Sequence, residues 1–237
     1  MSGDLDRIML EASESLVRMD YLSCERLCLE ALRLARDAGD WSYYCRILMP
    51  LQESRRQRRM IASEGTIRLG TGALRGPAAA WLEQFKSGCV VVTKPFAPQD
   101  ASQLLEAARA ARRHVEVLYC DNDVDATWWT LRSFTGPQVQ RPVEAPPAAW
   151  VEKWLAPMGH GETTAGDTSD TGSGQTAADW FIAATELLGD SALDQVGSEL
   201  DGIDRVSALE QRLAVVTDHE ILHQRLWDAA RGAVVRG

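Results

Sequence analysis

The stretch that decides the fold is CVVVTKPFAPQDASQLLEAARAARRHVEVLY, residues 89–119. Its two ends, residues 89–93 and 114–119, are short apolar runs with β-branched side chains, which are typical of buried strands. The residues between them predict a helix over residues 98–113, because apolar side chains recur on one side of it: Leu104, Leu105, Ala108 and Ala111. A strand, a helix and a second strand in this order predict a right-handed parallel crossover, and therefore a mixed α/β fold.

The neighbouring segments extend this predicted sheet. Residues 66–69 are a possible strand. In residues 127–134 apolar and polar side chains alternate as in a strand, so we predict another one there. Residues 138–143 are a possible last strand, which we place at an edge because Pro142 cannot donate a hydrogen bond within a sheet. We expect the later strands to add antiparallel, so that residues 66–157 form a small mixed β-sheet domain with helices.

Helical sequence precedes and follows the predicted sheet. Residues 1–65 repeat apolar side chains at helical spacing and predict an N-terminal helical hairpin, in which Pro50 should kink or break the third helix. Residues 158–176 are rich in Gly, Thr, Ser and Asp and predict a flexible acidic loop. Residues 177–237 predict a helical C-terminal bundle, in which Gly189 ends the first helix.

The N-terminal helical segment carries a pattern typical of one repeat family. The residues that carry it are Tyr21, Cys24, Cys28, Ala31, Leu32 and the phrase LARDAGD at residues 34–40. With these residues the segment resembles a tetratricopeptide repeat, a paired-helix module, over about one and a half repeats. The resemblance implies a helical hairpin suited to protein contacts, and it implies no ligand. An ordinary helical hairpin is the alternative.

Composition limits the compartment and the class of partner. The chain has 237 residues, 45% of them hydrophobic, but no run of 18 apolar residues that would span a membrane. Its first residues are acidic, unlike a secretory signal, and its five cysteines are irregularly spaced, so we expect free thiols and a cytoplasmic location. Residues 1–65 carry a charge of −1, residues 66–157 carry +1, and residues 158–237 carry −9. An acidic C-terminal third disfavours nucleic acid as a partner.

The sharpest chemical pattern is HEILH at residues 219–223, which matches H-E-x-x-H. Four residues apart on a helix, two imidazoles can share a zinc ion, and the glutamate between them can hold the attacking water. This pattern suggests a zinc-dependent hydrolase, with His219 and His223 as metal ligands and Glu220 as the catalytic residue.

The surrounding sequence favours a structural role for the same residues. Thr217 and Glu220 fit the S/T-x-x-E capping box, which would start a helix at Thr217. A third metal ligand would have to come from upstream, for example from His160 or Glu162. The structural interpretation predicts that both histidines lie on a solvated polar side, and that the opposite side faces the core: Leu222, Leu226, Ala229 and Ala230.

Two further motifs each have a chemical and a structural interpretation. Gly70, Gly72 and Gly76 lie between a possible strand and a helix, where a glycine-rich turn can hold a phosphate. A plain connector is the alternative, and we favour it. Residues 170–173, DTGS, spell an aspartic-protease motif, but the paired carboxylate that this chemistry requires is missing, which favours a solvated loop.

Charged and aromatic clusters complete the candidates. The basic run at residues 55–59 predicts either a solvated helix end or an intramolecular contact. Trp128 and Trp129 should face opposite sides of a strand, one in the core and one more exposed. Together with Trp150 and Trp154 they suggest an aromatic cluster at a domain interface, or an aromatic surface for a partner.

The sequence thus combines a repeat-like helical start with no complete catalytic set. Our first hypothesis is a non-enzymatic protein-interaction or scaffold protein whose partner is another protein. The zinc-dependent hydrolase is the first alternative, and a nucleotide- or phosphate-binding module is the second.

Overall fold

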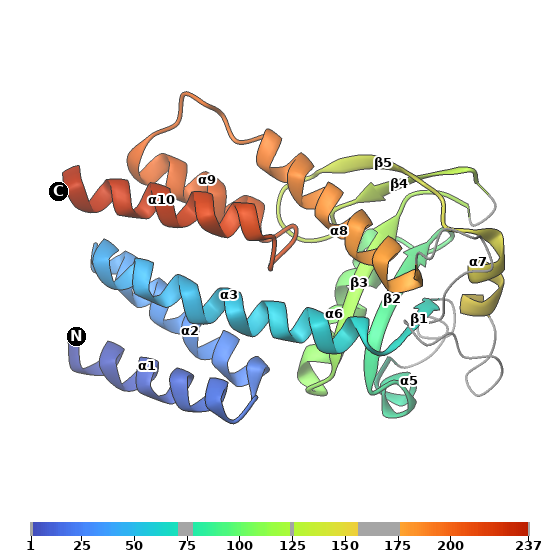
Figure 1. Ribbon diagram of the computed structural model, residues 1–237, viewed down its shortest axis with the longest axis horizontal. Coiled ribbons are helices and arrows are strands. Elements are labelled where there is room, and N and C mark those ends of the chain that lie inside the picture. The colour runs from blue at the N-terminus through green and yellow to red at the C-terminus, as the bar shows by residue number, and fades with distance from the viewer. Residues whose placement is uncertain (1, 71–77, 124–125, 156–175, 237) are drawn as a thin grey trace. The chain divides into compact units, whose positions relative to one another are not determined.

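The computed structural model describes four stretches of the chain, residues 2–70, 78–123, 126–155 and 176–236. Helices and one five-stranded sheet make up these stretches (Figure 1), which confirms the mixed α/β fold class. The chain divides into two compact units. Unit 1 contains Met1–Arg58 and Ala192–Gly237, and unit 2 contains Arg59–Ser191. The N-terminal and C-terminal helices therefore belong to the same unit, although they are far apart in the sequence.

Unit 2 is built on the sheet, whose strand order is β1-β2-β3-β4-β5. The strands are β1 (Thr66–Leu69), β2 (Ser87–Thr93), β3 (His114–Cys120), β4 (Trp128–Arg132) and β5 (Gln140–Glu144). The first three strands are parallel, and the last two continue antiparallel. The predicted strands, the parallel connection from β2 to β3 and the antiparallel additions are confirmed.

Helices of unit 2 pack on both faces of the sheet. On one face, alternate residues of β2 and β3 share a core with α5 (Ala78–Gln84) and α6 (Pro98–Ala110), including Leu82, Val90, Leu104 and Val117. On the other face, the ring of Trp129 lies edge-on to Trp180 of α8 (Ala177–Asp194), with centroids 5.7 Å apart. The ring centroid of Trp154, on α7 (Ala148–Leu155), lies 5.8 Å from that of Trp180.

The tryptophans follow the alternation of a strand. Trp129 is fully buried, whereas Trp128 is 61% exposed, which confirms that they face opposite sides. Trp150 and Trp154 are also buried. Trp129, Trp150 and Trp154 are therefore part of the core of unit 2, and Trp128 is the exposed member of the four.

Pro142 lies in β5 at the edge of the sheet, as predicted. The N–H of Ala145 donates to the carbonyl of Thr127, and the N–H of Ser133 donates to the carbonyl of Val139. Because the direction of hydrogen bonding alternates along an antiparallel pair, the backbone of Pro142 faces away from β4. Its missing N–H therefore removes no bond within the sheet, and it makes this edge a poorer template for another strand.

Unit 1 is formed by helices in its described residues. They are α1 (Ser2–Val17), α2 (Tyr21–Asp37), most of α3 (Trp41–Ser63), α9 (Gly202–Leu213) and α10 (Glu220–Arg236). Asp20 caps α2 by accepting from the N–H of Ser23 (3.2 Å), and Asp40 accepts from the N–H of Tyr43 (2.9 Å) at the start of α3. The apolar stripe predicted for α2 is buried: Cys24, Leu27, Cys28, Ala31, Leu32 and Ala35.

Of the two alternatives predicted for Pro50, the break is wrong and the kink stays a prediction, and one predicted helix end is also wrong. α3 does not break at Pro50, because the neighbouring Leu48 and Leu51 are both buried and their packing outweighs the lost backbone bond. α8 continues through Gly189, which follows the buried Leu188. In both helices tertiary burial overrides a local signal against helix.

Candidate functional site

The H-E-x-x-H pattern lies at the start of α10, in unit 1. The helix begins at Glu220, so His219 occupies the N-cap position. The ring Nδ1 of His219 accepts a hydrogen bond from the backbone N–H of Leu222 (3.3 Å), as an N-cap side chain does. The predicted capping box of Thr217 and Glu220 is therefore wrong. Glu220 accepts instead from the side chain of Gln224, one turn along the helix (3.0 Å).

Both histidines of the pattern are buried, which contradicts the predicted solvated face. His219 is 1% exposed and His223 is 2% exposed. The ring Nε2 of His223 donates to the carbonyl oxygen of Thr217 (3.0 Å). Burial is the main cause that lowers the pKa of His223 to about 4, so its ring is neutral at pH 7. The side of α10 predicted to face the core is buried at three positions: Leu222, Leu226 and Ala230.

The hydrogen bonds of the two rings bear on the zinc hypothesis. With its proton on Nε2, the neutral ring of His223 has its lone pair on Nδ1, which is buried and has no partner among the described residues. The Nδ1 lone pair of His219 already accepts a backbone N–H. Within the described stretches, no group of three or more His, Cys, Asp or Glu side chains is placed to hold a metal ion. Zinc binding stays a prediction, and coordination through Nδ1 of His219 would require that ring to give up its bond from Leu222.

One buried carboxylate next to this pattern joins two arginines of α3. Glu25 of α2 accepts from the Nε of Arg55 (2.8 Å) and from Arg58, and all three residues are buried. Another nitrogen of Arg55 donates to the carbonyl of Thr217 (2.9 Å), which also accepts from His223. This network connects α2, α3 and the turn between α9 and α10.

The network changes the interpretation of the basic run at residues 55–59. The solvated alternative is wrong for Arg55 and Arg58, and an intramolecular contact is confirmed for both. Arg59 pairs with Glu186 of α8, in unit 2. Burying a guanidinium without a partner costs on the order of several kcal/mol, so each buried arginine requires the acceptor that it has.

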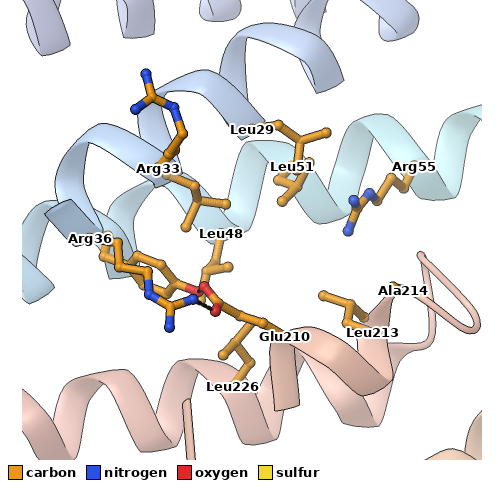
Figure 2. A pocket seen from close by; sticks show the side chains of 12 residues that line it. Leu29, Arg33, Arg36, Leu48, Leu51, Arg55, Glu210, Leu213, Ala214 and Leu226 are labelled. Atoms are coloured by element: carbon orange, nitrogen blue, oxygen red, sulfur yellow. Dashed lines mark hydrogen bonds and ion pairs between the residues drawn. The ribbon is translucent and has the colours of Figure 1, made fainter. Parts of the chain in front are cut away.

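A cleft of about 320 Å³ lies within unit 1, between α2 and α3 on one side and α9 and α10 on the other (Figure 2). Its apolar lining is dominated by leucines: Leu29, Leu32, Leu48, Leu51, Leu213 and Leu226. The volume lies at the lower end of the range, about 300–1,000 Å³, that is typical of pockets for small molecules. Both ends of the chain contribute walls, so the cleft exists only when unit 1 is assembled.

A polar contact fixes one end of the cleft. Glu210 of α9 binds Arg36 of α2 and accepts from the hydroxyl of Tyr44 on α3 (2.6 Å). Another nitrogen of Arg36 donates to the hydroxyl of Ser207 (2.8 Å). Burial raises the pKa of Tyr44 well above its usual value, so this hydroxyl stays protonated and donates. In Figure 2, Arg36 turns toward Glu210, and Arg55 extends into the space between the helices.

Several candidates from the sequence lie outside the described residues: Gly72, Gly76, His160, Glu162 and residues 170–173. Gly70 is described, and its N–H donates to the carbonyl of Val91 (2.9 Å), directly after β1. The phosphate-binding alternative therefore stays a prediction.

Sequence reasoning missed the cleft. Along α2, Leu29, Leu32, Arg33 and Arg36 recur at the spacing i, i+3, i+4 and i+7, which places all four on one face. This mixed stripe is a signal, but it resembles an ordinary amphipathic face. Its meaning depends on Glu210, which lies 174 residues away from Arg36 in the sequence.

Comparisons with known proteins found no significant match among protein-family models, curated proteins or solved structures. The resemblance to a tetratricopeptide repeat therefore stays a prediction. Among the described helices, none combines the length and the apolar character needed to cross a membrane.

Replacing Glu25 by glutamine is expected to destabilise unit 1 by roughly 3–5 kcal/mol, because Arg55 and Arg58 would stay buried without a carboxylate. Urea denaturation followed by circular dichroism measures this change in the free energy of unfolding. Glu30→Gln is the matched control on the same helix: its exposed pair with Arg26 (3.6 Å) is expected to contribute less than about 1 kcal/mol. Equally small effects of both substitutions would contradict the role given to Glu25.

The burial of His223 predicts a loss of stability in mild acid. Its pKa is about 4 in the folded chain and 6.5 for an unperturbed histidine, so the unfolded state binds the proton first as the pH falls. The stabilisation is complete above about pH 6.5 and is lost progressively down to about pH 4, by about 3 kcal/mol in total.

The variant His223→Gln isolates this effect, because glutamine keeps an N–H donor for Thr217 but does not titrate. The free energy of unfolding, measured in urea at pH 7 and pH 5, should fall more for the unchanged protein than for the variant. The same fall in both would show that His223 is not buried as a neutral ring.

Proposed function

We propose that the protein is a non-enzymatic protein-interaction module, and that the cleft of unit 1 receives an apolar side chain of a partner protein. The observation that carries this proposal is the leucine lining contributed by helices from both ends of the chain. Pockets of this kind hold the anchor side chains that contribute most of the binding energy at protein interfaces.

The surface of unit 1 supports the same function. Most of the large apolar side chains that are exposed among the described residues belong to this unit, and Val17, Met19 and Met49 are at least 70% exposed. Leu29 is 45% exposed and also lines the cleft. Leu29 therefore offers exposed apolar surface at the cleft itself, which is a usual feature of an interaction site.

The two chemical alternatives have less support. For the zinc-dependent hydrolase, His219 and His223 are buried and already hydrogen-bonded. For phosphate binding, only Gly70 of the three glycines is described. A cytoplasmic location is part of the proposal, because the five cysteines are free thiols, which persist in a reducing compartment.

Replacing Leu29 by serine is expected to weaken partner binding by about tenfold or more, because burying a leucine contributes about 1.5–3 kcal/mol and each 1.4 kcal/mol corresponds to a factor of ten. Peptides selected from a random display library against the full chain supply the partners. Fluorescence anisotropy with labelled peptides measures their dissociation constants.

Leu10→Ser is the matched control, since Leu10 is 62% exposed on α1 but does not line the cleft. It should change the dissociation constants by less than about twofold. A library that yields no binder, or binders that Leu29→Ser retains at full affinity, would refute the proposed function.

A further inference from the structure

We propose that the partner segment is acidic. Carboxylates of the partner bind at Arg33 and Arg36, one helical turn away from the apolar side chain that enters the cleft. This inference rests on the proposed function, because it specifies the chemistry of the segment that the cleft receives.

The order of residues along α2 sets the spacing of the two contacts. Leu29 and Leu32 contribute to the apolar lining, and Arg33 and Arg36 follow them four residues later on the same helix face. Four residues of a helix rise about 6 Å, which is one turn. A partner helix that lies along α2 therefore meets both groups if its own apolar and acidic residues are three or four positions apart.

The charge of the cleft determines which sign of charge it favours in the partner segment. Three arginines and one glutamate line it, Arg33, Arg36, Arg55 and Glu210. Because Glu25 neutralises Arg55, the charge open to a partner is that of Arg33 and Arg36 against Glu210, in a chain whose net charge is −9. A positive cleft attracts anionic segments and repels cationic ones. Cationic segments are attracted instead to the acidic remainder of the protein surface.

The exposure of each arginine shows which ones are available to a partner. The side chain of Arg55 is 8% exposed and is held by Glu25, so it is structural. The side chain of Arg33 is 66% exposed, and its bond to Asp37 (3.1 Å) is an exposed pair within one helix, which another carboxylate replaces at little cost.

Arg36 is held in place but remains accessible. Its side chain is 38% exposed, and its bonds to Glu210 and Ser207 fix its direction at the end of the cleft. A guanidinium has five N–H donors, so these two bonds leave room for a further acceptor. Figure 2 shows Arg33 and Arg36 rising from the same helix, with Arg33 directed away from Glu210. Together they flank the α2 side of the cleft with positive charge.

Three alanine-based helical peptides test the inference. Each carries two leucines one turn apart, and the next turn carries glutamate, glutamine or lysine. Fluorescence anisotropy measures their dissociation constants with the full chain. The glutamate peptide is expected to bind about tenfold more tightly than the glutamine peptide, and the lysine peptide more weakly than both, because a charge-assisted bond to arginine is stronger than a neutral one. The preference should shrink as the salt concentration rises.

Two substitutions on α2 assign the preference to the cleft. Arg33→Gln should reduce the glutamate preference to about threefold or less, and Arg33→Glu should reverse it in favour of the lysine peptide. Arg26→Gln is the matched control, because Arg26 forms the same kind of exposed pair, with Glu30, but does not line the cleft. It should leave the preference unchanged.

The outcomes separate this inference from the function on which it rests. Equal binding of the glutamate and glutamine peptides, both weakened by Leu29→Ser, would overturn the acidic partner and leave the proposed function standing. A glutamate preference that survives Arg33→Glu would also overturn it, because the carboxylate would then bind elsewhere. Peptides that do not bind, or that bind equally well to Leu29→Ser, would overturn the proposed function itself.

Discussion

Glu25 on α2 accepts hydrogen bonds from Arg55 and Arg58, two buried arginines of α3. Arg55 also donates to the backbone carbonyl of Thr217. The rest of unit 1 depends on this contact, because a guanidinium inside a protein is tolerated only with acceptors in place. The arginines come from α3 and their acceptors from two other parts of the chain, α2 and the turn before α10, so all the bonds of Arg55 form only when the three parts have assembled. The leucine-lined cleft lies within the same assembly, and Arg55 belongs to both.

This arrangement gives the helical unit its functional interpretation. A pocket walled by helices from both ends of the chain is rigid in proportion to the contacts that hold those helices. The network around Glu25 joins α2 to α3. The contact among Glu210, Arg36 and Tyr44 joins α9 to α2 and α3. A rigid apolar pocket with charged residues at its rim suits the recognition of a protein segment, since apolar burial supplies affinity and charge supplies selectivity.

The sequence predicted the sheet well because its signals are local. The periodicity of the side chains identifies the strands around Val91 and Val117 and the helix between them. The missing N–H of proline places Pro142 at the edge of the sheet. Each of these features is decided within a few residues of chain, so a short window is enough to identify it.

The candidate site was less predictable, because its contacts join residues that are distant in the sequence. Arg55 and Glu25 are 30 residues apart, and Arg55 and Thr217 are 162 apart. Local patterns therefore left a solvated helix end as one of two interpretations of the basic run, and the capping-box interpretation predicted solvated histidines. The turn before α10 packs into the core, so burial overrode both patterns, and His219 replaced Thr217 as the helix cap.

Native-state hydrogen exchange tests most directly whether the two ends of the chain form one cooperative unit. The slowest amide protons of α2, α3, α9 and α10 should share one free energy of opening, and urea should lower it with one common slope, because Arg55 of α3 binds both Glu25 of α2 and Thr217 in the turn before α10. Exchange of α9 and α10 at a clearly lower free energy and with a smaller slope, while α2 and α3 stay protected, would contradict the account.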